Sequence, residues 1–140
     1  MAITEIKQGE LVLARHIPAT DAWGDGLKFF SADGDFQQVG SWGYAAGKTL
    51  LAHSHNPVPR TVAWTQEVLY VRSGRLRADI FDTDDQPVAT LEAAAGDILV
   101  LLRGGHGYQI LEDGTQVLEI KNGPYLGAEA DRRRLSSRRV

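Results

Sequence analysis

The sequence contains no cysteine, so disulfide bonds and thiolate metal ligands are excluded. No apolar run approaches the roughly 20 residues that span a bilayer, and the first ten residues lack the apolar stretch of a signal peptide. We therefore expect a cytoplasmic protein with no membrane partner. An excess of positive charge is also missing, because the net charge is −3. This balance argues against nucleic acid as a partner.

What the sequence does have is a series of short β-type segments separated by turn residues. Clusters of Gly, Asp and Ser at 32–35, 72–74, 82–85 and 112–114 favour tight turns. Strands that recur at such short spacing predict an all-β sandwich or barrel. The expected strands are 11–16, 27–30, 36–44, 49–55, 62–72, 75–81, 88–94, 97–102, 107–111 and 116–121.

A chain of 140 residues fits one domain. We expect a core over 36–121, with N-terminal strands within 11–30 and a C-terminal tail over 127–140. A short helix is expected within 127–138, since acidic residues come early there and basic ones late. The five arginines of 131–140 form either a solvated end or a surface that pairs with a subunit or an anion.

Three histidines and one glutamate stand out from this pattern. His53 and His55 are two residues apart, so in a strand both imidazoles face the same side. Glu67 lies early in the next expected strand, and His106 follows a glycine turn. If these strands are neighbours, the four side chains converge on one divalent first-row metal ion, with positions left for water or substrate.

The spacing of these residues resembles the two motifs of the cupin family. In the first motif, five residues separate Gly47 from His53, and six separate Glu67 from Gly74. The second motif is matched over 96–106, ending on His106. The sequence departs from the family pattern in two places: residues 56–60 lengthen the gap before Glu67, and Leu102 stands where the family usually has proline.

The resemblance covers about residues 40–121, and it implies a double-stranded β-helix, or jelly-roll barrel. It also implies that His53, His55, Glu67 and His106 hold one metal ion, which is Fe, Mn, Ni or Zn. Residues 104–107 and 121–125 resemble a subset of small, mostly uncharacterised cupins, and some related cupins act on nucleotide-linked keto sugars. Small cupins often form homodimers through an N-terminal strand, and 11–13 is a candidate for it.

This resemblance leaves two kinds of function open. The first is a metal-dependent enzyme, a dioxygenase or a keto-sugar isomerase or epimerase, that acts on a small oxygen-rich substrate. In it the metal acts as Lewis acid, and Glu67 or Tyr108 moves a proton. The second is a sensor or binding module without turnover, with or without metal. The same fold hosts all of these, so fold alone does not choose among them.

Other residues have both a functional and a structural interpretation. Tyr108 lies two residues after His106 and should share its inward face. Trp42, Tyr44 and Trp64 line an apolar substrate pocket or pack in the core. Arg103 binds an anionic group or is solvated. His16 has no such neighbours in the pattern, and we expect it to be structural.

Overall fold

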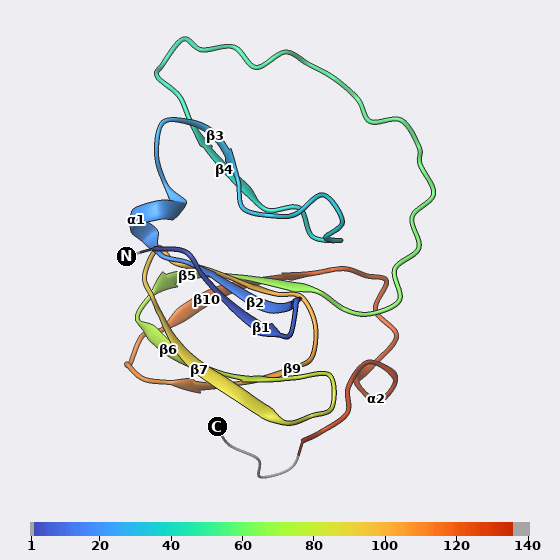
Figure 1. Cartoon of the computed structure of the whole chain (residues 1–140). Coiled ribbons are helices and arrows are strands. Elements are labelled where there is room, and N and C mark those ends of the chain that lie inside the picture. Colours follow the sequence, from blue (N-terminus) through green and yellow to red (C-terminus); the bar gives the residue numbers. More distant parts are fainter. Residues whose placement is uncertain (1, 136–140) are drawn as a thin grey trace.

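The structure is a computed structural model that describes residues 2–135. Over this range the chain is almost entirely built of strands, with two single-turn helices (Figure 1). The strands and helices, in chain order, are β1 (Thr4–Gln8), β2 (Leu11–Ile17), α1 (Ala19–Ala22), β3 (Gly26–Phe29), β4 (Gly40–Gly43), β5 (Glu67–Ser73), β6 (Arg75–Phe81), β7 (Pro87–Ala94), β8 (Ile98–Leu101), β9 (Gly105–Ile110), β10 (Gln116–Lys121) and α2 (Ala128–Asp131).

The strands form two antiparallel sheets and a separate hairpin. The larger sheet has the order β1-β2-β8-β5-β10, the smaller one has the order β7-β6-β9, and β3 pairs only with β4. The predicted all-β class is therefore confirmed. No sheet closes on itself within residues 2–135, so β9 and β10 are free edges.

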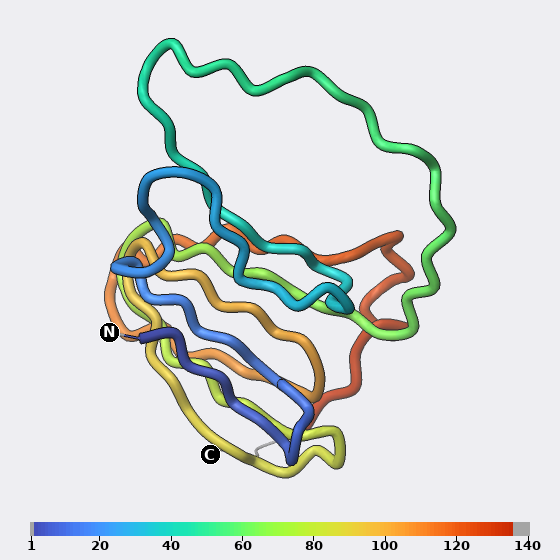
Figure 2. The backbone as a smooth tube through the Cα atoms, turned by 45° about the horizontal axis from the view of Figure 1, so that its top comes forward, coloured from blue at the N-terminus to red at the C-terminus, as the bar shows by residue number. Residues whose placement is uncertain are grey.

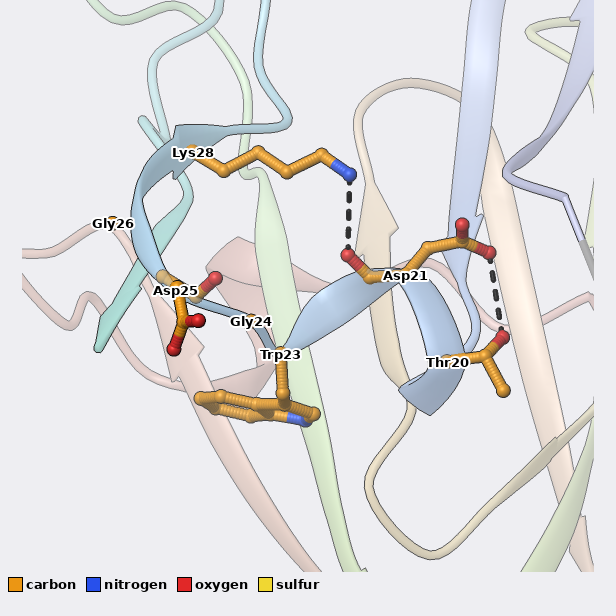
Figure 3. Close-up of a pocket in the computed structure, with 8 residues that line it drawn as sticks. Thr20, Asp21, Trp23, Gly24, Asp25, Gly26 and Lys28 are labelled. Atoms are coloured by element: carbon orange, nitrogen blue, oxygen red, sulfur yellow. Dashed lines mark hydrogen bonds between the residues drawn. The ribbon is translucent and has the colours of Figure 1, made fainter. Parts of the chain in front are cut away.

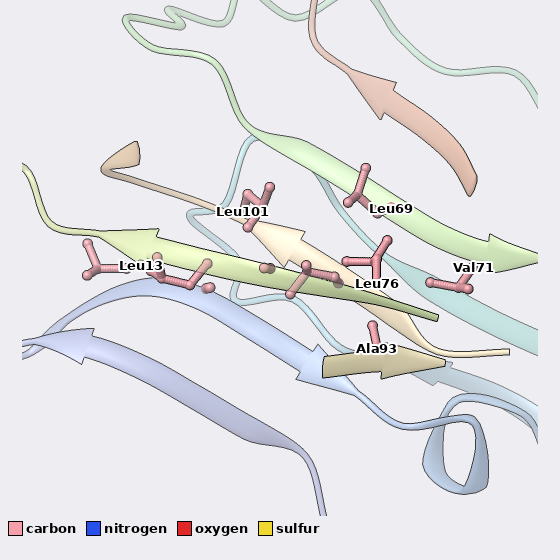
Figure 4. Close-up of a cluster of buried hydrophobic side chains, with 10 residues drawn as sticks. Leu13, Leu69, Val71, Leu76, Ala93 and Leu101 are labelled. Atoms are coloured by element: carbon pink, nitrogen blue, oxygen red, sulfur yellow. The ribbon is translucent and has the colours of Figure 1, made fainter. Parts of the chain in front are cut away.

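The two sheets bury a shared apolar core (Figure 4). Strand β6 shows how the sequence produces this core. Leu76, Ala78 and Ile80 alternate with charged residues along the strand, so one face of β6 is apolar. The larger sheet packs against this face, and Ala93 of the neighbouring strand β7 adds to it. The buried members are Leu13, Ala14, Leu69, Val71, Leu76, Ala78, Ile80, Ala93, Leu99 and Leu101.

The opposite face of the larger sheet carries a second apolar cluster. The ends of the hairpin, Phe30 and Val39, pack there against Val68 and Val100, and Ala22 of α1 joins them. The backbone N–H of Phe30 donates to the carbonyl of Val39 over 2.8 Å, which extends the pairing of β3 with β4. The hairpin therefore lies outside the two-sheet sandwich and covers one face of it (Figure 2).

The segment 44–66 differs most from the sequence-based expectation. The predicted strand over 49–55 is wrong, and the strand expected from 62 begins only at Glu67. The segment arches away from both sheets (Figures 1 and 2), and residues 44–65 are almost entirely exposed. Pro57 and Pro59 lie within it and have no N–H to donate to a ladder. We call residues 44–66 the long loop.

The two chain ends also differ from expectation. Strand β1 was not predicted, and it pairs with the candidate dimer strand over 11–13 on one side, whereas β8 pairs with β2 only over Ala14–Ile17. The predicted C-terminal helix is restricted to Ala128–Asp131, because the backbone is extended again at Arg132. Residues 136–138 of that prediction lie outside the described range. None of the described helices is long and apolar enough to cross a membrane.

Candidate functional site

The inner faces of the free edge strands carry polar side chains at the open side of the sandwich. On β9, His106 and Tyr108 lie opposite Ile80 and Ala78 of the core, so both face inward. On β10, Glu119 and Lys121 lie opposite Leu69 and Glu67 and also face inward. Because no strand covers these edges in the described chain, the polar cluster opens to solvent.

A close contact between Glu67 and His106 lies at the centre of this cluster. The Nε2 atom of His106 is 2.6 Å from the Oε2 atom of Glu67, and only 8% of the Glu67 side chain is exposed. That oxygen is shielded from solvent, yet it has no hydrogen bond of regular geometry. A buried carboxylate oxygen in this condition suits a cationic ligand, because an unsatisfied buried charge is costly.

The electrostatics of the cluster favour the charged carboxylate. Burial by itself raises the pKa of Glu67, but the polar contact with His106 and the positive charges of His106 and Lys121 outweigh burial. The net result is a pKa below the ordinary value of 4.5. Glu67 is therefore an anion at neutral pH, which is the form that a metal ion or a cationic side chain requires.

Tyr108 lies beside this pair. Its ring centroid is 5.3 Å from that of His106, and the residue is 38% exposed, so one part of it reaches solvent. Burial, and then the negative charges of Glu67 and Glu119, raise the pKa of Tyr108 well above its ordinary value of 10. Its hydroxyl therefore keeps its proton across the physiological range and serves as a hydrogen-bond donor.

His53 and His55 do not join this cluster in the structure. Both are exposed on the long loop, with ring centroids 5.1 Å apart, and the Nδ1 atom of His53 contacts the carbonyl of Leu51. Within residues 2–135 no group of three or more His, Asp or Glu side chains is arranged to hold a metal ion. Of the four predicted ligands, the structure thus brings together Glu67 and His106 only.

The predicted pocket residues fall into two separate pairs. Trp64 and Arg103 lie together where β8 ends and β5 begins: the guanidinium is 3.9 Å from the indole ring, whose N–H donates to the Leu102 carbonyl. Trp42 and Tyr44 stack with centroids 6.0 Å apart on the hairpin and its continuation, and both are exposed. The second pair therefore lies away from the inward-facing cluster.

A surface pocket of ≈ 230 Å³ lies elsewhere, beside α1 (Figure 3). Its floor is the ring of Trp23, whose indole N–H donates to the Gly96 carbonyl, and Lys28 reaches across it to the Asp21 carbonyl. These contacts hold the turn after α1 in place. The lining residues are Thr20, Asp21, Trp23, Gly24, Asp25, Gly26, Lys28 and Ser41.

His16 has the structural role expected of it. Its Nε2 atom is 2.9 Å from the Oδ2 atom of Asp97, and both residues are buried. The same carboxylate accepts hydrogen bonds from the backbone N–H groups of Ala19 and Ala94. The pair therefore ties β2, α1 and the turn before β8 together.

Sequence reasoning missed two members of the cluster, Glu119 and Lys121. A signal for them is present, because Leu118 and Ile120 alternate with them along β10. The usual interpretation places the apolar residues inward, whereas here Leu118 and Ile120 are largely exposed on the outer face. Charged residues on the inner face of an edge strand mark a polar site rather than core.

Comparisons with protein-family models, with curated proteins and with solved structures found no match to this chain. The resemblance to cupins therefore depends on the motif residues alone, and membership of that family stays a prediction. Functional inference has to start from the inward-facing cluster of Glu67, His106, Tyr108, Glu119 and Lys121, which we call the edge site.

Proposed function

We propose that the chain is a metal-binding cupin in which the edge site holds one divalent ion through Glu67 and His106. In this proposal His53 and His55 complete the site from the long loop, and the barrel closes when that loop covers the free edges of β9 and β10. The observation that carries the proposal is the 2.6 Å contact between Glu67 and His106. The motif comparison selects these two residues from separate strands as ligands of one ion.

The apolar residues of the long loop support closure. Leu51 is 84% exposed, and Leu50, Val58 and Val62 are also exposed, although a loop in permanent contact with water needs none of them. Ile110 on the inner face of β9 is exposed as well. Burial of such side chains stabilises by about 25 cal/mol per Å² of apolar surface, so a loop folded over the edge site removes unfavourable exposure on both surfaces.

The chemistry that follows is catalysis on a small oxygen-rich substrate. When bound, a divalent ion supplies Lewis-acid polarisation of a substrate oxygen. The Tyr108 hydroxyl, which keeps its proton, donates to a substrate oxygen. Glu67, held as an anion, accepts a proton or stays a ligand. This arrangement suits two reactions. One is dioxygen-dependent cleavage of the substrate, and the other is isomerisation or epimerisation of a keto sugar.

A second candidate is a non-catalytic module that binds a small molecule without metal. One observation favours it: the Glu67 carboxylate already has His106 as a polar partner at 2.6 Å in the described chain, and no third side chain there is arranged with them to hold a metal ion. In that case the long loop closes over an organic ligand. The cytoplasmic location and the homodimer expected from the sequence remain predictions under both candidates.

Metal titration of the purified chain distinguishes the two candidates. After removal of bound ions, the wild type is dialysed against Fe²⁺, Mn²⁺, Ni²⁺ or Zn²⁺ and its metal content is measured. We expect one ion per chain, and at least about tenfold weaker binding in H55Q, E67Q and H106Q. The matched control is H16Q, which changes the remaining histidine outside the site and should bind metal as the wild type does.

Either of two results contradicts the metal proposal. One is a wild-type chain that takes up none of the four ions, which leaves the metal-free module. The other result is that the H55Q and H106Q variants retain metal as tightly as the H16Q control does. Circular dichroism of each variant shows that a loss of metal does not come from unfolding. Oxygen uptake with catechols and proton exchange in keto sugars then separate the two reactions.

A further inference from the structure

We propose that the pocket beside α1 is a binding site for one neutral sugar ring, separate from the edge site (Figure 3). The pocket has a volume of ≈ 230 Å³ and lies in the turn that leads from α1 into β3. Most ligand pockets measure roughly 300–1,000 Å³, so this one suits a molecule of a single ring. The inference needs no metal ion and no residue of the edge site.

The floor of the pocket is a tryptophan ring that is held in a fixed position. The indole N–H of Trp23 donates to the Gly96 carbonyl over 2.8 Å, and the ring meets Tyr70 edge-on at a centroid distance of 5.7 Å. Trp23 is nevertheless 51% exposed, so part of its surface is available to a ligand. An aromatic ring of this kind offers an apolar surface to the C–H face of a sugar ring.

Polar groups that donate and accept hydrogen bonds lie around this floor. Figure 3 shows Lys28 on the side of the pocket opposite Trp23, where its ammonium contacts the Asp21 carbonyl at 3.4 Å. That contact is long, and an ammonium group carries three donors, so Lys28 retains donors for a ligand. The Asp25 carboxylate is exposed and has no hydrogen bond or ion pair within residues 2–135. It is therefore available as an acceptor.

The charges of the pocket favour a neutral ligand over an ionic one. The charged side chains that line it are Asp21, Asp25 and Lys28, and the Asp21 carboxylate is turned to the Thr20 hydroxyl, at 3.5 Å. Asp25 repels an anion and Lys28 repels a cation, so either ion loses on one side what it gains on the other. A hydroxyl group accepts from Lys28 and donates to Asp25 without this cost. A sugar ring combines such hydroxyls with an apolar face for the indole.

The pocket is preformed, because α1 is tied to the rest of the fold at both ends. The Asp97 carboxylate accepts a hydrogen bond from the backbone N–H of Ala19 at the start of α1. The Ser41 hydroxyl, from β4, donates to the carbonyl of Ala22 at its end. A ligand that enters a preformed pocket does not have to order its walls, which favours binding of a small molecule.

NMR titration of the full chain with methyl glycosides tests the site. The probes are the methyl pyranosides of glucose, mannose and galactose, and the signals followed are the three indole N–H groups of the protein. We expect at least one probe to shift the Trp23 signal with a dissociation constant on the order of 1 mM. The signal of Trp42, which is exposed on the hairpin, should not move. Sorbitol has the hydroxyls but no ring, and should bind at least about tenfold more weakly.

Two substitutions, each with a matched control, locate the binding site. D25A removes the acceptor and should weaken binding about tenfold, since a charge-assisted hydrogen bond is lost. It breaks no contact of that side chain in the described part of the protein, so the fold is kept. W23A removes the floor and should abolish saturable shifts of the backbone signal of Gly26. The controls D33A and W42A change an exposed aspartate and an exposed tryptophan outside the pocket, and should bind as the wild type does.

The inference is overturned if none of the three glycosides shifts the Trp23 signal, or if sorbitol binds as tightly as they do. It is also overturned if D25A binds as tightly as D33A, or if adenine, a planar heterocycle, binds more tightly than every glycoside. The titration uses metal-free protein, and H106Q should bind the sugar as the wild type does. Failure of the proposed metal site therefore leaves this inference intact, and the reverse also holds.

A disaccharide distinguishes the two sources of such a ring. The probe is cellobiose, lactose or mannobiose, whichever ends in the sugar that binds as a methyl glycoside. Binding at least as tight as that of the glycoside assigns the pocket to the end of a glycan, and weaker binding assigns it to a free monosaccharide. Both results support a site for one sugar ring.

Discussion

Two buried carboxylates show how single residues set the properties of this protein. Glu67 faces the open side of the sandwich with one oxygen against His106, whereas Asp97 is enclosed by three donors. Both are at most 8% exposed. The first has capacity for another cation, and the second has none, which separates a site residue from a structural one.

The lowered pKa of Glu67 makes stability depend on pH in a defined direction. Because its pKa in the folded protein lies below the ordinary 4.5, the unfolded chain takes up the proton first as the pH falls. The stabilisation is complete above 4.5 and is lost as the pH falls through the lowered folded-state pKa. In urea titrations of metal-free protein, the unfolding free energy of the wild type should fall more steeply across this window than that of E67Q. If the unfolding free energies of the wild type and E67Q change with pH in parallel, the lowered pKa of Glu67 is contradicted.

Removal of the Asp97 carboxylate should be costly. The substitution D97A leaves three donors without their acceptor: the His16 ring and the backbone N–H groups of Ala19 and Ala94. We expect the free energy of unfolding to drop by about 3 kcal/mol, measured by urea denaturation. The exposed control E10A should change it by less than about 0.5 kcal/mol. If D97A changes the free energy of unfolding as little as E10A does, the structural role of Asp97 is excluded.

The strands depend on the turns that connect them, and the turn between β5 and β6 is a clear example. Gly74 has a φ of +79°, and a Cβ added there would overlap the side chain and backbone of Thr115. Gly114 has nearly the same φ, +78°, but a Cβ there meets nothing within 4 Å. The backbone conformation costs an alanine about 1–2 kcal/mol at both positions, and only G74A adds a steric clash.

We therefore expect G74A to lower the melting temperature clearly more than G114A does. Thermal unfolding followed by circular dichroism measures both. Equal shifts in the two variants show that backbone conformation alone accounts for the cost, and that Thr115 does not approach Gly74 as closely as described.

At the scale of strands and turns, the sequence predicted those features that depend on the local residue pattern. Strand β6 and its flanking turns follow from Leu76, Ala78 and Ile80 between Gly74 and Asp82, and the structure confirms them. The segment 49–55 could not be decided locally, because an extended loop and a strand share the same backbone conformation and differ only in a distant partner. The contact between Glu67 and His106 was predictable because the motif residues fall on real strands; the inward face of Glu119 was not, because its apolar neighbours point outward.

For the whole molecule, the outstanding feature is an incomplete sandwich with a long exposed loop beside it. The free edges of β9 and β10 expose unpaired backbone groups, which folded proteins normally cover or protect. The long loop carries two histidines and several exposed apolar side chains. Closure of the loop over the edge site would pair the backbone groups of the free edges and bury the exposed apolar side chains. It would also complete the proposed set of metal ligands.

Amide hydrogen exchange with and without Zn²⁺ tests this closure most directly. The account predicts that one equivalent of Zn²⁺ slows exchange across 49–55 and along β9, and that H106Q abolishes the protection while H16Q keeps it. Binding of Zn²⁺ that leaves exchange in 49–55 unchanged would contradict the account, since His53 and His55 would then have no part in the site.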